Sequence, residues 1–334
     1  MTIKIDEKSI FEAIERRKPR SVALNGPEAL IPKLQDVADH IAEMFHIQVY
    51  IIGDTCWGSC DLNTHAAEML SADILFNVGH TIAMDTFGQK VIMIGAFDDI
   101  NFEFVASKCA RDLAGKYKTV SLVTDSQHLH QIEDVKKIFE DHGYNVIIGR
   151  GRGQLRDAQV FGCEFYPAFS VQNMVDAYIF LGQSMFHSAS VALSTERPTF
   201  MLDPYFEEYT EVNEFARGMQ KKAVLSIYKA LDAEKIGIII GLKEGQFAHL
   251  RAIELKKELE KSGKKVQMIA LTEISQERIQ IFKGIDAFVQ VACPRIGTDN
   301  HFNKPVLSVP QALSLIRLLK KEPIGEFLRI QHWL

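Results

Sequence analysis

Residues 120–148, VSLVTDSQHLHQIEDVKKIFEDHGYNVII, carry the pattern that decides the fold. They open with a short apolar run, Val120 to Thr124, and close with the β-rich run NVII, and both runs have the length of a strand. Between them, apolar residues recur with the period of an amphipathic helix, and a glycine stands where that helix should end: Ile132, Val135, Ile138, Phe139 and Gly143. The stretch therefore predicts strand, helix and strand, as in the parallel sheets of α/β proteins.

The same pattern occurs on both sides of this stretch. Apolar runs at Ser21 to Leu24 and at Ile236 to Ile240 are each followed by a helical period and then by a β-rich run, IQVYII or KVQMIA. The two helical periods consist of Ile31, Leu34, Val37, Ala38, Ile41 and Phe45, and of Phe247, Leu250, Ile253 and Leu259. Each unit then adds a last strand, in VIMIG from Val91, TFMLD from Thr199 and VLSVP from Val306. We therefore predict three similar parallel-sheet α/β domains, an internal triplication, over residues 1–115, 116–230 and 231–334.

An aspartate before the third apolar run of each unit allows the units to be aligned: Asp73, Asp176 and Asp286. Cys60 and Cys163 each lie 13 residues before the aspartate of their own unit. The two cysteines therefore occupy the same place in the repeated pattern, which is unlikely by chance.

The third unit has Glu273 at this offset and carries Cys293 directly after its strand instead. The first two units have His80 and Gln183 at the position of Cys293. The carboxyl ends of parallel strands meet along one edge of a sheet, where ligands bind. One thiol per unit therefore predicts a single shared metal site.

Composition limits the class of protein. The 334 residues are 47% hydrophobic and 24% charged, which is typical of a globular protein with a sizeable core. The net charge of −5 argues against general nucleic-acid binding. No apolar run approaches the roughly 20 residues of a membrane helix, and the first residues lack a secretory segment. We expect a cytoplasmic protein with no membrane or nucleic-acid partner, whose separated thiols are metal ligands, catalytic groups or buried residues rather than disulfides.

The five cysteines differ in their surroundings. Cys60 and Cys163 lie in loops after strands, in GDTCWGSCD and FGCEF, and Cys293 precedes a proline. Cys109 lies in the helical pattern FVASKCARDL and is predicted to be buried, and Cys56 is a spare thiol without ferredoxin spacing. Structural zinc sites usually use close CxxC pairs, and this chain has none. Three thiolates instead favour a [4Fe-4S] cluster with one iron open to substrate.

Four segments together resemble the archaeal diphthamide-biosynthesis family, the 2-(3-amino-3-carboxypropyl)histidine synthases. They are GDTCWGSCD at 53–61, ADILFNVGH at 72–80, the QVFGC run at 159–163 and VACPRIGTDN at 291–300. The resemblance covers essentially the whole chain, and it implies that Cys60, Cys163 and Cys293 hold a [4Fe-4S] cluster at the centre of the three domains.

The resemblance also implies a transferase of the radical type that uses S-adenosylmethionine without the CxxxCxxC motif, which is absent here. It implies that cleavage of the sulfur to Cγ bond yields methylthioadenosine and a 3-amino-3-carboxypropyl radical, which adds to C2 of a histidine imidazole in translation elongation factor 2. This is the first step of diphthamide biosynthesis. An electron-donor protein and a homodimer are further expectations from the family.

Several other residues are candidates for the site. Arg150 and Arg152, in a loop with Gly149, Gly151 and Gly153, are candidates for binding the carboxylate of S-adenosylmethionine or the partner protein. A solvated loop and a phosphate site are the alternatives. His80 and Gln183 are candidates for lining the cofactor pocket. Asp61, next to Cys60, either supports that ligand by a hydrogen bond or caps a helix. His128 and His130 are predicted to be surface residues, and Trp333 to pack on a neighbouring unit or a second subunit.

Three alternative functions stay open. A quinolinate synthase also has a triplicated α/β fold and a three-cysteine cluster with an open iron, and it would act as a dehydratase. A non-catalytic iron–sulfur sensor or electron carrier would be expected to have a fully ligated cluster. An α/β binding protein with incidental cysteines would bind no iron.

Overall fold

Three parallel sheets form the framework of the protein. The computed structural model describes residues 3–80, 90–153, 155–299 and 301–323. In every sheet the strand order is second, first, third and fourth along the chain. The first sheet consists of β3 (Gln48–Ile51), β2 (Ser21–Asn25), β4 (Ile74–Val78) and β5 (Val91–Ile94). The second consists of β8 (Asn145–Ile147), β7 (Thr119–Thr124), β9 (Ala177–Leu181) and β10 (Thr199–Asp203), to which β11 (Glu208–Glu211) adds an antiparallel edge strand. The third consists of β13 (Lys265–Leu271), β12 (Lys235–Gly241), β14 (Ala287–Gln290) and β15 (Val306–Leu307).

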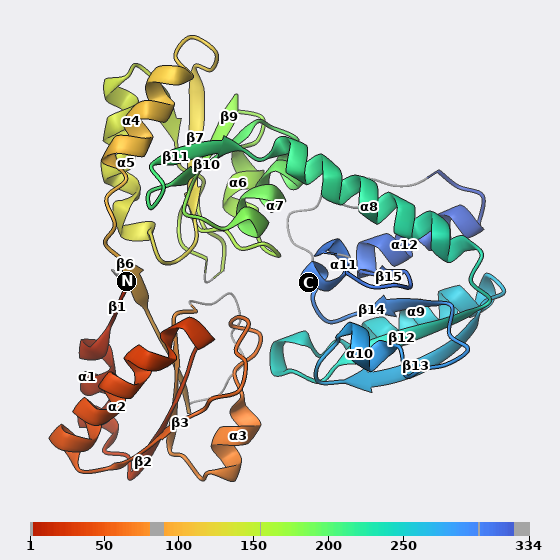
Figure 1. Ribbon diagram of the computed structural model, residues 1–334, viewed down its shortest axis with the longest axis horizontal. Coiled ribbons are helices and arrows are strands. Elements are labelled where there is room, and N and C mark those ends of the chain that lie inside the picture. Colours follow the sequence, from red (N-terminus) through yellow and green to blue (C-terminus); the bar gives the residue numbers. More distant parts are fainter. Residues whose placement is uncertain (1–2, 81–89, 154, 300, 324–334) are drawn as a thin grey trace.

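Helices accompany each sheet, so that three lobes are visible in Figure 1. The first lobe contains α1 (Glu7–Arg17), η1 (Glu28–Leu30), α2 (Ile31–Phe45) and α3 (Thr64–Met69), with β1 (Ile3–Ile5) paired to β6 (Ala96–Asp98). The second contains α4 (Glu103–Asp112), η2 (Leu129–Gln131), α5 (Ile132–Asp141), α6 (Tyr166–Val171) and α7 (Met185–Thr195). The third contains η3 (Glu244–Gln246), α9 (His249–Lys261), α10 (Gln276–Ile279), α11 (Pro294–Asp299) and α12 (Val309–Leu319), and α8 (Asn213–Leu231) runs from the second lobe to the third.

The helical periods were predicted correctly in two of the three units. In α5, Ile132, Val135 and Phe139 are buried, and Gly143 follows the helix with φ 86°. In α2, Leu34, Val37 and Ile41 are buried. The third prediction was correct in part. The helix α9 begins at His249 and buries Leu259, but its other buried residues are Ala252 and Leu255, while Phe247 and Leu250 are exposed.

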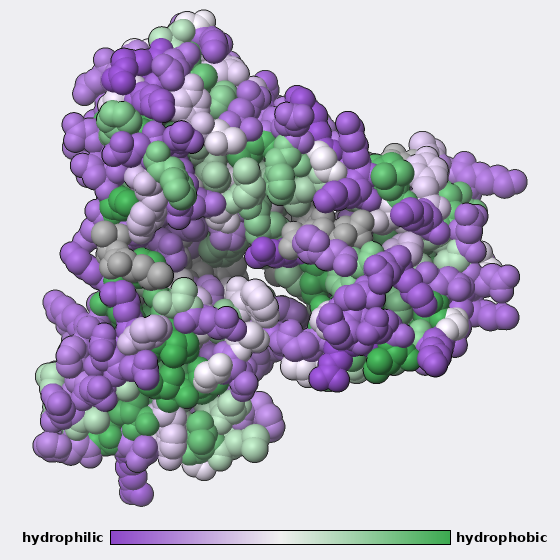
Figure 2. All heavy atoms as spheres, viewed as in Figure 1, coloured by the Kyte–Doolittle hydropathy of each residue, from purple (hydrophilic) through white to green (hydrophobic). Residues whose placement is uncertain are grey.

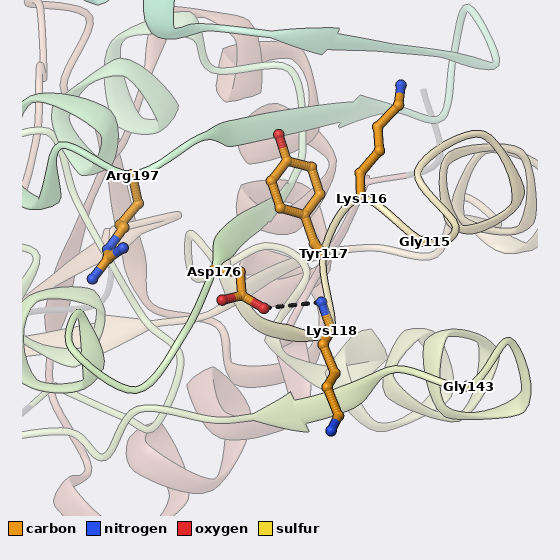
Figure 3. A pocket seen from close by; sticks show the side chains of 7 residues that line it. All are labelled: Gly115, Lys116, Tyr117, Lys118, Gly143, Asp176 and Arg197. Carbon is orange, nitrogen blue, oxygen red and sulfur yellow. Dashed lines mark hydrogen bonds between the residues drawn. The ribbon is translucent and has the colours of Figure 1, made fainter.

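The three aligned aspartates have one structural role. Each accepts backbone N–H groups at the start of the first strand of its own sheet. Asp73 Oδ2 accepts from Arg20 and Ser21, Asp176 Oδ2 from Lys118 and Thr119, and Asp286 Oδ2 from Glu234 and Lys235, over 2.7–3.2 Å. Figure 3 shows Asp176 in this role, in a surface pocket with Tyr117 and Arg197. This pocket lies at the amino ends of the strands, at the opposite edge from the three candidate thiols.

The packing of α4 differs from the expected division at residue 115. Val105 and Cys109 of this helix share a core cluster with Val120 and Leu122 of β7, so α4 packs on the second sheet. The prediction that Cys109 is a core residue is confirmed, because its side chain is fully buried. The second and third sheets also share one core cluster, to which α8 contributes, whereas the first sheet has clusters of its own.

None of the helices in the described ranges has both the length and the apolar character needed to cross a membrane.

Candidate metal centre

Three half-buried thiols, one from each lobe, follow the carboxyl ends of strands. Cys60 lies in the loop between β3 and α3, Cys163 lies between β8 and α6, and Cys293 lies between β14 and α11. All three are free thiols. Figure 2 shows that the surface is hollowed where the lobes meet. The carboxyl-edge placement that the sequence predicted therefore occurs in all three sheets.

The three thiols act on one another electrostatically. Burial raises the pKa of the Cys163 thiol well above its ordinary value, and the charges of Cys293 and Cys60 raise it further. Burial, followed by the charge of Cys60, raises the pKa of Cys293 to about 11. Burial also raises the pKa of Cys60, against the hydrogen bond from Gln246. Because such effects fall off with distance, we expect the three cysteines of separate lobes to lie near one another.

The donor set suits an iron–sulfur cluster better than a single metal ion. In the part of the chain that the structure describes, no three His, Cys, Asp or Glu side chains lie close enough together to hold one ion. In a [4Fe-4S] cluster each thiolate binds a different iron, so three thiols need to surround the cluster rather than meet at a point. The positive charge of a bound metal would favour the thiolate form of these side chains.

Cys60 is held from the third lobe. Gln246 Nε2 donates to Cys60 Sγ at 3.4 Å, and the backbone N–H of Gly245 donates to the carbonyl oxygen of Cys60 at 3.0 Å. Next to it, Glu244 Oε1 accepts from the backbone N–H and the hydroxyl of Thr64 at 2.7 and 2.6 Å. Sequence analysis missed these residues, because their only signal was that they follow the carboxyl end of β12.

Asp61 and Lys243 form a buried ion pair beside Cys60. Lys243 Nζ lies 2.6 Å from Asp61 Oδ2 and 2.6 Å from Glu273 Oε1. Burial raises the pKa of Asp61 despite the lysine, whereas the two carboxylates outweigh burial and raise the pKa of Lys243. Asn63 occupies the N-cap position of α3, so of our two interpretations of Asp61 the helix cap was wrong. Asp61 therefore supports the loop that carries Cys60. Glu273 lies 13 residues before the aspartate of its unit, as Cys60 does in the first unit, and it contacts the same lysine.

Cys56 lies in a separate hydrogen-bond network. Its Sγ accepts from Asn25 Nδ2 at 3.2 Å and donates to the carbonyl oxygen of Asp61 at 3.0 Å. Burial raises the pKa of Cys56 to about 12, so it is a neutral thiol. His80 Nδ1 lies 3.6 Å from Cys56 Sγ, and burial, followed by the charge of His187, lowers the pKa of His80 to about 4.

The other candidate residues lie as follows. Gln183 is exposed, and its Nε2 donates to both carboxylate oxygens of Asp203 at 2.9 Å. Arg150 is exposed, and the guanidinium of Arg152 lies 4.1 Å from the centroid of the Tyr166 ring. Trp333 lies outside the described residues.

The glycines of the Arg150 loop allow neighbouring backbone segments to pack closely against it. A Cβ at Gly149 would lie 1.9 Å from the carbonyl oxygen of Pro167, and one at Gly151 would lie 1.9 Å from that of Leu155. Backbone approach of this kind requires glycine, which accounts for both positions without a phosphate.

The prediction for His128 was wrong, and that for His130 is confirmed, because His130 is exposed. His128 is buried, with Nδ1 3.0 Å from Gln131 Oε1 and its ring edge-on to Phe102. Phe102 is the N-cap residue of α4, the helix that packs on the second sheet across the expected boundary at residue 115.

The sequence analysis also did not predict a contact that joins the second and third lobes. The guanidinium of Arg295, two residues after Cys293, lies 4.9 Å from the centroid of the Phe186 ring in α7. The charge of Arg295 helps to lower the pKa of Cys293, against its burial, and also that of His187.

The fold and the thiols define an α/β protein with a candidate iron–sulfur centre, and comparison with known proteins identifies its family. The model of the diphthamide synthesis protein family matches residues 26–324. The chain therefore belongs to this family, and the resemblance predicted from the four sequence segments is confirmed.

Similar proteins include 2-(3-amino-3-carboxypropyl)histidine synthase of Pyrococcus horikoshii, which is 26% identical over 98% of this chain and 95% of that protein. Subunit 1 of the Kluyveromyces lactis synthase is 27% identical over 88% of this chain and 71% of that protein. The crystal structure of Dph2 from Pyrococcus horikoshii with a 4Fe-4S cluster superposes with a TM-score of 0.86 and covers 97% of this chain and 94% of that chain, at 26% identity.

Proposed function

We propose that this protein transfers the 3-amino-3-carboxypropyl group of S-adenosylmethionine to C2 of a histidine imidazole in translation elongation factor 2. This is the first step of diphthamide biosynthesis, and relatives along the whole chain are named for this synthase activity. The observation that carries the proposal is that three free thiols, one from each lobe, follow the carboxyl ends of strands in three like-ordered sheets. The quinolinate-synthase-like and sensor alternatives are tested by the same experiment below.

We propose Cys60, Cys163 and Cys293 as the ligands of a [4Fe-4S] cluster at the centre of a triplicated fold. Their places after the carboxyl ends of strands, one in each of three like-ordered sheets, support this assignment. The proposed units are residues 1–115, 116–230 and 231–334, with α4 packed across the first boundary onto the second sheet.

The chain's own residues would bind and orient the donor molecule. When bound, the cluster supplies one electron to the sulfur to Cγ bond of S-adenosylmethionine, which releases methylthioadenosine. We propose that Arg150 or Arg152 meets the carboxylate of the methionine portion and that His80 and Gln183 line the pocket. Because the pKa of His80 is about 4, its ring is neutral at neutral pH and would offer hydrogen bonds rather than charge.

Further partners belong to the same proposal. The reaction needs an electron-donor protein and a docking surface for elongation factor 2, and the family resemblance favours a homodimer. Five free cysteines suit a reducing cytoplasm, where disulfides are rare.

The test is anaerobic reconstitution with iron and sulfide, followed by dithionite, S-adenosylmethionine and mass spectrometry of the nucleoside product. Methylthioadenosine supports the proposal. 5′-Deoxyadenosine would mean that a different bond is cleaved, and intact S-adenosylmethionine beside a reduced cluster would favour the dehydratase or sensor alternative. Transfer to elongation factor 2 is then measured as the mass increase of its histidine-containing peptide.

A further inference from the structure

Four consecutive residues of the third lobe, Lys243 to Gln246, hold the loop that carries Cys60 in the first lobe. We call them the Lys243–Gln246 segment. Lys243 forms an ion pair with Asp61, and Glu244 accepts hydrogen bonds from Thr64. The backbone N–H of Gly245 donates to the carbonyl oxygen of Cys60, and the side chain of Gln246 donates to its sulfur. The sulfur of one lobe therefore has a hydrogen-bond donor that belongs to another.

The donor on this sulfur is fixed and uncharged. Gln246 is 8% exposed, and its backbone N–H donates to the carbonyl of Lys243 at 3.0 Å, which closes the η3 turn. A thiolate carries no proton and can only accept hydrogen bonds, so the amide must turn Nε2 rather than Oε1 toward it. A buried amide in a closed turn loses little entropy when it makes this bond.

We propose that Gln246 is a positioning residue that raises the reduction potential of the cluster by donating a hydrogen bond to the Cys60 thiolate. This inference rests on the proposed assignment of Cys60 as a ligand. Reduction adds negative charge that spreads onto the cluster sulfurs, so a hydrogen bond to a sulfur stabilises the reduced state more than the oxidised state. A higher potential makes the cluster easier for a donor protein to reduce before it cleaves S-adenosylmethionine.

The experiment compares Gln246→Met with the wild-type holoprotein. Methionine keeps the length of the side chain and removes the donor. Gln267→Met, at an exposed position on β13 of the same sheet, is the matched control. Iron and sulfide per chain are measured first, and then an anaerobic redox titration is followed by electron paramagnetic resonance.

We expect Gln246→Met to retain wild-type iron. At the wild-type midpoint its ratio of reduced to oxidised cluster should fall about tenfold, which corresponds to about 59 mV for a one-electron couple. The Gln267→Met control should keep the wild-type midpoint. An unchanged midpoint in Gln246→Met with full iron would overturn the inference.

Two further variants separate the possible failures. If Gln246→Met loses iron, Gln246→Asn, whose amide is too short to reach the sulfur, is titrated instead. Iron loss in both variants, with unchanged circular dichroism, would assign Gln246 to cluster assembly and overturn the tuning role. Full iron in Cys60→Ala would overturn the ligand assignment itself. Iron loss in Cys60→Ala beside an unchanged Gln246→Met midpoint would overturn this inference alone.

Discussion

Glu244 and Thr64 are 180 residues apart in the chain, yet Glu244 Oε1 accepts hydrogen bonds from both the backbone N–H and the hydroxyl of Thr64. The glutamate thus satisfies an N-terminal N–H group of α3 from another lobe. With Lys243 it joins the third lobe to the loop of Cys60, so the structure ties the position of a candidate ligand to the contact between lobes.

Replacement of Glu244 by Gln should weaken this contact. The neutral amide gives up charge-assisted hydrogen bonds at a helix start, and we expect a loss of about 1–2 kcal/mol in the free energy of unfolding. Urea unfolding at neutral pH measures this loss. Glu15→Gln, at an exposed position in α1, should unfold like the wild type. Equal midpoints for the two variants would contradict the capping role.

The two thiols of GDTCWGSCD should behave differently. Cys56→Ala should keep its cluster iron, because Cys56 is a neutral, hydrogen-bonded thiol outside the proposed ligand set. Cys60→Ala should lose cluster iron and, with it, methylthioadenosine formation. Iron analysis and visible absorbance after anaerobic reconstitution distinguish these outcomes. Iron loss in Cys56→Ala with a folded chain would place Cys56 among the ligands.

Lys243→Met should be strongly destabilising, because it leaves the buried carboxylate of Asp61 without its cation. Removing one partner of a buried pair costs about 3–5 kcal/mol, and Glu273, the second carboxylate on this lysine, cannot supply the missing positive charge. The double variant Lys243→Met with Asp61→Asn should recover part of this loss in a double-mutant cycle of urea unfolding. Additive losses would mean that the two side chains do not stabilise each other.

Stability should fall in acid partly through Asp176. Backbone hydrogen bonds from Thr119 and Lys118 lower the pKa of this carboxyl in the folded state. Its contribution is therefore present above the unfolded pKa and is lost as the pH falls through the lower folded value. The carboxyl is exposed, so we expect less than about 1 kcal/mol.

Urea midpoints for the wild type and Asp176→Asn at about pH 6 and about pH 3 check this prediction. Asp176→Asn should lose less stability between the two pH values than the wild type does. Parallel curves would show that the carboxylate contributes nothing through its charge.

The local hydrophobic pattern predicted most of the helices and strands correctly. The apolar run at 120–124 became β7, the period of Ile132, Val135 and Phe139 became the buried face of α5, and all three thiols follow strands. One failure occurs where units meet, because His128 is buried against Phe102 at the start of α4, which packs across the expected boundary. The other occurs at a helix start, because Phe247 is exposed and precedes α9. Hydrophobic periodicity predicts which face of a helix packs on its own sheet, but it does not predict contacts with the next unit.

The sequence by itself determined three parallel-sheet units, an aspartate at the same place in each unit, and one thiol per unit at a strand end. These features follow from the hydrophobic periodicity of short segments and from the internal repeat. The tertiary structure alone decided which contacts form around those thiols: Gln246 with Cys60, Lys243 with Asp61 and Arg295 with Phe186. Such contacts depend on how whole sheets pack together, because the residues that meet are as many as 186 positions apart in the chain.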